Sequence, residues 1–201
     1  SATGDLSAQN LANVTTLTLT GDATLPNSTG DMPGAIDADS NAMTVAASAD
    51  LTGVTVSNYG NLTINAGQTL ELTLAQFKAF TITNNGTLNV TASGDLTAEN
   101  LSTVTRLTLD GDATLPNSTG DMPGAIDADS NAMTVAASAD LTGVTVSNYG
   151  DLTVNVGQIL DLTAAQATAF NAGTFTNNGT VNVSATGDLS AENLSNVTTL
   201  T

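Results

Sequence analysis

The sequence contains one arrangement of side chains that could bind a metal ion, and this arrangement occurs twice. Aspartates and an asparagine recur at alternate positions in the stretch DADSN, at residues 37–41 and again at 127–131. This spacing brings three side-chain oxygens to one side of a tight loop, and hard cations such as Ca²⁺ prefer oxygen ligands. The sequence therefore predicts two calcium sites, with the ligands Asp37, Asp39 and Asn41 in the first and Asp127, Asp129 and Asn131 in the second.

The pattern departs from the EF-hand calcium loop at two positions. An EF-hand requires glycine directly after the third ligand and glutamate at the twelfth position. Here these positions hold Ala42 and Ser48 in the first copy, and Ala132 and Ser138 in the second. An EF-hand is therefore excluded, and two interpretations stay open. One is a looser calcium loop, and the other is a solvated turn formed by Asp and Asn side chains ahead of a strand.

The composition removes most catalytic chemistry. Among 201 residues there are 19 acidic residues, two basic residues and neither Cys nor His, which gives a net charge of −17. Thiolate nucleophiles, disulfides, zinc sites built from Cys or His, and the commonest general base are all excluded. The two cations, Lys78 and Arg106, are replaced by threonine in the other copies of the repeat described below. We therefore expect that this chain is not an enzyme.

The same composition limits the possible partners. A nucleic-acid binder displaces phosphate counterions with many Lys and Arg side chains, which this chain lacks. No apolar stretch approaches the ~20 residues that a membrane-spanning helix needs. We expect no nucleic acid as a partner and no membrane insertion within this segment, and we expect any export signal or anchor to lie outside it.

A long internal repeat determines the organisation of the chain. The segment from Gly21 to Gly60 recurs without a change from Gly111 to Gly150, with a period of 90 residues. The flanking residues repeat less strictly, and a third copy begins at Ser184 after a three-residue insertion. We expect a single continuous domain over residues 1–201, with repeat copies at 1–90 and 91–183 and a partial copy at 184–201.

Each repeat contains a shorter, degenerate period. Residues 41–60 and 61–80 form segments of 20 residues, 81–102 a segment of 22 and 103–130 a segment of 28, each with alternating apolar and polar stretches bounded by Gly, Asn or Asp. Alternation of this kind predicts β-strands. Its return about every 20 residues predicts a parallel β-solenoid, in which each turn of the coil forms one rung stacked on the next.

The predicted fold is thus all-β: a parallel β-solenoid (β-helix) with about 20–28 residues per rung and four rungs per 90-residue repeat, or eight whole rungs in the chain. Leu, Val, Ile, Ala and Met should point inward, and Thr, Asn and Ser outward. The longest rung should carry a protruding loop from Pro26 to Ser40. Helix should be scarce, with the best candidates at residues 72–80 and 162–170.

Two other folds stay open at this point. Residues 10–22 and 100–112 have the L-x-x-V-x-x-L-x-L spacing of a leucine-rich repeat. The 90-residue period also fits a pair of β-sandwich domains.

The phrases GDLTAENL, LELTLAQ and TNNGTLNV, set between Gly and Asn turns, resemble the repeat regions of large bacterial extracellular surface proteins and adhesins with β-solenoid arrays. The resemblance covers the whole chain. It implies an extracellular location at the cell surface, with adhesion, cell-cell contact or envelope layering as the role of the family.

Two functions are expected from these observations. The first is a structural and adhesive extracellular repeat protein that forms a rod, stalk or filament, either by end-to-end stacking with copies of itself or within a longer array. The absence of an atypical capping rung at either end motivates it, because soluble solenoids normally cover their terminal strand edges. The alternative is a calcium-dependent glycan-binding or S-layer-like envelope module, whose Asp loops would recognise cell-surface glycan or neighbouring subunits. Calcium is the cofactor that the sequence suggests.

Overall fold

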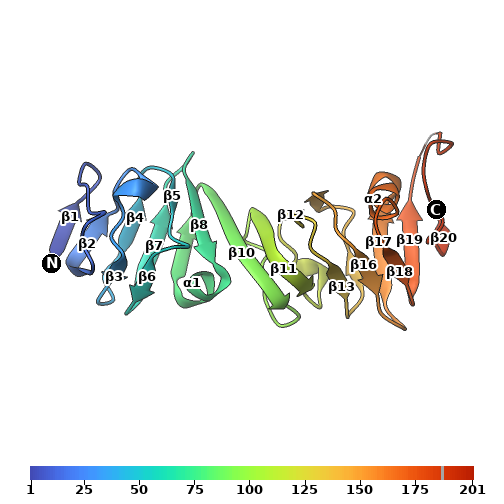
Figure 1. Ribbon diagram of the computed structural model, residues 1–201, viewed down its shortest axis with the longest axis horizontal. Helices are drawn as coiled ribbons and strands as arrows, with labels where there is room; N and C mark the ends of the chain where they lie inside the picture. The colour runs from blue at the N-terminus through green and yellow to red at the C-terminus, as the bar shows by residue number, and fades with distance from the viewer. Residues whose placement is uncertain (187) are drawn as a thin grey trace. The chain divides into compact units, whose positions relative to one another are not determined.

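The computed structural model describes residues 1–186 and 188–201, and its strands coil as a parallel β-solenoid (Figure 1). Strands account for 42% of the residues and helices for 10%, and the chain makes about 10 turns. The predicted all-β parallel solenoid is confirmed. Antiparallel sandwich domains are excluded because the strands pair in parallel, and a leucine-rich horseshoe is excluded because the coil carries more than one sheet.

The chain divides into two compact units, residues 1–91 and 92–201. This boundary lies one residue beyond the predicted end of the first repeat copy, and it falls within the strand β10. A single continuous domain over residues 1–201 stays a prediction.

The first unit contains the following elements in chain order: β1 (Ala2–Asp5), β2 (Leu17–Thr24), the 3₁₀ turn η1 (Thr29–Asp31), β3 (Ala35–Asp37), β4 (Met43–Val45), β5 (Ala49–Asp50), β6 (Thr55–Ser57), β7 (Asn61–Ile64), β8 (Thr69–Thr73), α1 (Leu74–Ala79), β9 (Thr81–Asn84) and the start of β10 (Thr87–Asp95).

The second unit contains β11 (Arg106–Thr114), the 3₁₀ turn η2 (Thr119–Asp121), β12 (Ala125–Asp127), β13 (Met133–Val135), β14 (Ala139–Asp140), β15 (Thr145–Ser147), β16 (Leu152–Val154), β17 (Ile159–Thr163), α2 (Ala164–Phe170), β18 (Phe175–Asn177), β19 (Thr180–Ser184) and β20 (Thr199–Leu200).

Strand β2 joins two faces of the coil in the first unit. Its first half pairs with β3, where Leu17 lies opposite Ile36, and its second half pairs with β4, where Ala23 lies opposite Met43. The stack continues from β3 to β6 and from β4 through β7 to β9, while β5 and β8 begin a separate stack. In the second unit β11 pairs with β12 and β13 in the same way.

This branching shortens the rungs relative to the prediction. Leu107 pairs with Ile126, although both residues lie in the segment 103–130 that the sequence suggested as one 28-residue rung. The expected protruding loop in the first unit instead contains η1 and β3, and both Pro26 and Pro33 are buried. Hydrogen bonds between neighbouring rungs join residues 20 to 22 positions apart. The prediction of a 28-residue rung with a protruding loop is therefore wrong. This part of the chain forms rungs of ordinary length, so the chain makes about 10 turns and not eight.

The core is a set of stacked aliphatic side chains. Met43 lies opposite Leu62, and Val45 lies opposite Ile64, and all four are fully buried. Burial of one such side chain contributes about 1.5–3 kcal/mol to folding. Between them, outward-facing threonines stand in register on successive rungs: Thr24, Thr44, Thr63 and Thr83. The predicted alternation of aliphatic and polar positions is confirmed.

Two short helices, α1 and α2, lie within the ranges predicted as helical. Each begins with a capping box, in which a threonine and the glutamine three residues later bond each other's backbone N–H. The buried Gln76 also donates from Nε2 to the carbonyls of Leu51 at 2.7 Å and Val54 at 2.9 Å. Gln166 makes the equivalent bonds in the second unit. Each glutamine thus supplies a donor to two buried carbonyls, of which the first, Leu51 or Leu141, also accepts a backbone N–H. Neither helix, nor any other in the described part of the chain, has the length and apolar character to cross a membrane.

Candidate functional site

The predicted calcium ligands of the first unit lie in the turn between β3 and β4. Asp37 is the last residue of β3, and Asn41 lies two residues before β4. Asp39 and Ser40 between them adopt left-handed backbone angles, with φ of 46° and 64°. Such angles are uncommon outside glycine but are adopted more readily by Asp and Asn. The structure therefore brings the three predicted residues together in one sharp turn.

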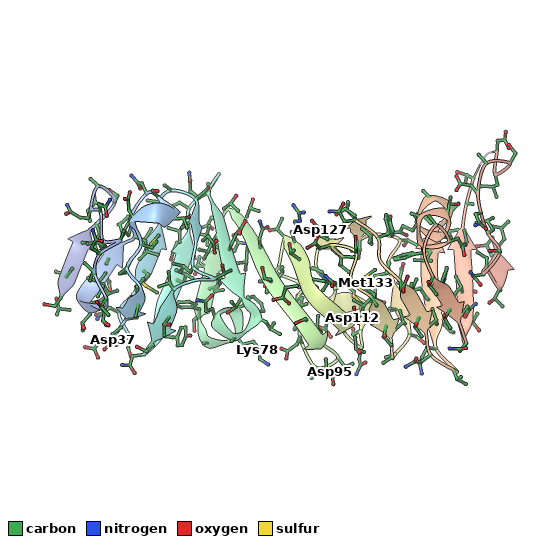
Figure 2. The ribbon with its side chains drawn as sticks, viewed as in Figure 1. Asp37, Lys78, Asp95, Asp112, Asp127 and Met133 are labelled. Carbon is green, nitrogen blue, oxygen red and sulfur yellow. The ribbon has the colours of Figure 1, made fainter. Side chains whose placement is uncertain are left out.

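Asp37, which is labelled in Figure 2, acts in this turn as a hydrogen-bond acceptor. Its Oδ1 accepts from the side-chain Nδ2 of Asn58 at 2.8 Å and from the backbone N–H of Asp39 at 3.2 Å. The bond from Asn58 comes from the next rung, whereas the bond from Asp39 closes the turn itself. One carboxylate oxygen thus fixes both the turn and the stacking of two rungs.

Asn41 contributes its amide nitrogen to the backbone. Its Nδ2 donates to the carbonyls of Ala38 at 3.0 Å and Leu19 at 3.2 Å. The next rung passes so close to this residue that a Cβ on Gly60 would overlap the Asn41 carbonyl. Glycine is required at that position because any larger residue would push the two rungs apart.

The second copy repeats these contacts. Oδ1 of Asp127 accepts from Nδ2 of Asn148 at 2.8 Å and from the N–H of Asp129 at 3.2 Å. Asn131 donates from Nδ2 to the carbonyl of Leu109 at 2.9 Å. The identical segment therefore folds in the same way in both units.

A single cation distinguishes the two copies. Arg106 of β11 forms an ion pair through Nη2 with Oδ2 of Asp127, whose side chain is only 8% exposed. Burial raises the pKa of Asp127, but hydrogen bonds from Asn148, Arg106 and the Asp129 N–H, together with the Arg106 charge, outweigh it and lower the pKa below its ordinary value. In the first unit Thr16 stands where Arg106 stands in the second.

The turns carry fewer free ligands than the sequence pattern suggested. Within residues 1–186 and 188–201, no three side chains of the types His, Cys, Asp and Glu are grouped so that they could hold a metal ion. The predicted ligands Asp37 and Asp127 each have Oδ1 occupied by two hydrogen bonds, and Asn41 and Asn131 direct Nδ2 to carbonyls. These contacts show that the four residues stabilise the turns. Calcium binding stays a prediction.

Two open depressions lie next to each other in the first unit and share Thr29 and Asp50. The first has a volume of about 310 Å³ and is also lined by Ser48, Ala49, Thr69 and Glu71. The second has a volume of about 360 Å³ and is also lined by Ala12, Met32, Pro33, Gly34, Thr52, Gly53 and Val54. Asp50 and Glu71 lie in register on β5 and β8, so two carboxylates stand one rung apart. The linings offer hydroxyl and carboxylate groups but no cation.

Sequence reasoning missed two contacts that the structure shows. The bond between Asp37 and Asn58 and the ion pair between Arg106 and Asp127 both join residues 21 positions apart. That separation is one rung, so a correct register would have revealed both pairs. The 28-residue rung assumed for this part of the repeat concealed them.

Comparison with protein-family models, with curated proteins and with solved structures gave no match to this chain. The geometry of the rungs is therefore the basis for assigning a function.

Proposed function

We propose that this chain is a structural and adhesive extracellular repeat protein, which forms a rod, stalk or filament at the cell surface by stacking with copies of itself or as part of a longer array. The observation that carries the proposal is the repetition of contacts between rungs. Nδ2 of Asn58 donates to Oδ1 of Asp37 at 2.8 Å in the first unit, and Nδ2 of Asn148 donates to Oδ1 of Asp127 at 2.8 Å in the second.

Repetition of contacts supports a modular array. When each rung bonds only to its neighbours, stability is approximately a sum over rungs and their interfaces, and a further repeat can be added without new kinds of contact. Parallel strands also present a row of backbone donors and acceptors along each edge, which can pair with the strand of another copy.

Charge and chemistry are consistent with a structural role. A net charge of −17 keeps a protein soluble and resists collapse through repulsion. The linings of the two depressions contain neither His nor Cys. We infer that the chain performs no catalysis. The resemblance of its repeat phrases to bacterial surface proteins and adhesins supports display outside the cell.

A second candidate is a calcium-dependent glycan-binding or S-layer-like envelope module. The open depressions around Thr29 and Asp50 favour it, because hydroxyl and carboxylate groups are suitable partners for sugar hydroxyls. If calcium organises the Asp turns, calcium should raise the melting temperature by mass action, whereas a metal-independent rod should not respond.

Electron microscopy of the purified chain tests the first proposal. Images are recorded at two protein concentrations, each with calcium and with a chelator. We expect rods joined end to end or filaments, more of them at the higher concentration and with or without calcium. Filaments that need calcium would support the envelope module instead, and compact monomers in every condition would contradict end-to-end stacking of the chain with copies of itself.

A pair of matched variants tests whether strand β20 forms the contact between stacked copies. Leu200 of β20 is 50% exposed, whereas the equivalent residues Leu17 and Leu107 are buried by the rung that stacks on them. Leu200→Lys should therefore suppress end-to-end association, because a charge on a strand edge opposes pairing. Val156→Lys places the same charge on another exposed apolar residue, 78% exposed, and should leave association unchanged.

A further inference from the structure

The two identical 40-residue segments provide a comparison within one chain. The segments Gly21–Gly60 and Gly111–Gly150 are identical at every position. In each turn Oδ1 of the first aspartate accepts the same two hydrogen bonds at the same distances, 2.8 Å and 3.2 Å. A difference at the turn between the units must therefore come from residues outside these segments.

Arg106 is such a residue. Its guanidinium bonds Oδ2 of Asp127, the oxygen that the Asn148 and Asp129 bonds leave available. In the first unit Asn58 and Asp39 occupy Oδ1 of Asp37 in the same way, and Thr16 is too short to reach Oδ2 as Arg106 does. The second unit thus shows which group the turn accepts, and the first unit has the same turn without that group.

We propose that the turn at Asp37 binds the guanidinium of an arginine side chain presented by another protein, in the position that Arg106 occupies on Asp127. This inference names a partner chemistry and does not depend on whether the chain forms a rod. It would make each array with a threonine at this position a receptor for an arginine-bearing surface.

The chemistry of the turn favours arginine over the alternatives. A guanidinium forms charge-assisted hydrogen bonds to carboxylates and loses less hydration on binding than an ammonium, so arginine is preferred to lysine. A calcium ion needs six to eight oxygen ligands. In this turn Nδ2 of Asn41 donates to the backbone carbonyls of Leu19 and Ala38. These two carbonyl oxygens are therefore already engaged, which reduces the number of oxygen ligands available to a metal ion. The acidic chain attracts cations generally, so specificity must come from the guanidinium geometry.

Nuclear magnetic resonance of the full chain tests the proposal. The probe is N-acetylarginine amide, added at constant ionic strength, with N-acetyllysine amide and calcium chloride as separate titrations. The readouts are the Asp39 backbone N–H and the Asn58 side-chain NH₂, which both bond Asp37. We expect saturable shifts of these signals with the arginine probe, and no saturable shift of the equivalent signals in the second unit.

Two reciprocal variants make the test specific. Thr16→Arg introduces the tethered cation into the first unit and should abolish the saturable shifts there. Arg106→Thr removes it from the second unit and should create a second set of shifts, at Asp129 and Asn148. An unchanged far-UV circular dichroism spectrum shows that each variant keeps its fold.

Several results would overturn the proposal. Equal shifts with the lysine probe would show only a general attraction of cations. Undiminished binding to the Thr16→Arg variant would place the probe elsewhere on the chain. Saturable shifts with calcium that the arginine probe cannot displace would assign the turn to a metal, and the absence of any saturable shift with arginine would remove the site.

Discussion

Amide side chains, exposed at Asn58 and buried at Gln76, join neighbouring rungs. Asn58 donates to Asp37 across one rung, and Gln76 donates to two carbonyls of the turn between Leu51 and Val54. A hydrogen bond contributes only about 1 kcal/mol net, but a buried carbonyl left without its donor costs about 1–3 kcal/mol. These side chains therefore contribute to the stacking of the rungs.

Removing the buried glutamine amide should destabilise the fold measurably. Gln76→Ala removes the donor to the Val54 carbonyl and one of the two donors to the Leu51 carbonyl, which keeps the bond from the Val54 N–H, and the free energy of unfolding in urea should fall by about 1–3 kcal/mol. Gln9→Ala, at an exposed position, is the control and should change it by less than about 0.5 kcal/mol. Equal effects of the two variants would show that the amide of Gln76 does not stabilise the turn.

The Arg106 ion pair should make part of the stability of the second unit depend on pH. The pKa of Asp127 is lowered in the folded chain from 3.8, so its ionised form stabilises the fold above that pH and this contribution is lost as pH falls through the folded pKa. Arg106→Thr should therefore lower the free energy of unfolding by about 1–3 kcal/mol at pH 7.

The difference between the native chain and Arg106→Thr should shrink below about pH 4. Denaturant unfolding of both proteins between pH 7 and pH 2 measures it. A difference that grows as pH falls would contradict the role assigned to the pair.

At the scale of elements, the short alternating strands and both helices could be predicted from the sequence, because period-2 alternation and the Thr-x-x-Gln capping pattern are local signals. The long strand β2 could not. Gly21 and Asp22 in its middle are typical of a turn, yet the strand continues through them, and Gly21 packs against the Thr3 side chain of the previous rung, whose Oγ1 would lie 2.6 Å from an added Cβ. A glycine required by stacking cannot be distinguished from a glycine required by a turn without the neighbouring rung.

The same limit applies to the candidate site. The structure confirms that Asp37, Asp39 and Asn41 lie in one turn. This grouping could be predicted because it depends only on the local spacing of the three residues. The partners of these residues on other rungs depend on the register, which the branching of β2 and β11 determines. For this reason the pairing of Arg106 with Asp127 was inaccessible to sequence reasoning alone.

Close approach of the rungs predicts a large effect at one glycine. Gly60→Ala places a Cβ on the Asn41 backbone, so the rungs must separate, and we expect a loss of about 1–3 kcal/mol in the free energy of unfolding. Gly53→Ala is the matched control, since no atom lies within 4 Å of the added Cβ. Thermal unfolding followed by circular dichroism compares the two, and similar melting temperatures would contradict the close packing of these rungs.

For the whole molecule, the net charge of −17 should make stability depend on salt. Repulsion among carboxylates that are one rung apart, such as Asp50 and Glu71, is screened as the Debye length falls from about 10 Å at 0.1 M to about 3 Å at 1 M. The melting temperature should therefore rise with sodium chloride. Choline chloride should act equally, because screening does not depend on the identity of the cation. A melting temperature that falls with salt would show that attraction between charges dominates instead.

The central claim is that the repeats are interchangeable modules built from the same stacked rungs. Inserting a second copy of residues 21–110 between Asp110 and Gly111 tests it most directly, because both junctions then have the native local sequence. We predict a folded protein with the same strand content per residue, whose particles in electron microscopy are longer by about 20 Å, the thickness of four to five rungs. Particles of unchanged length, or an added copy that unfolds separately, would contradict the account.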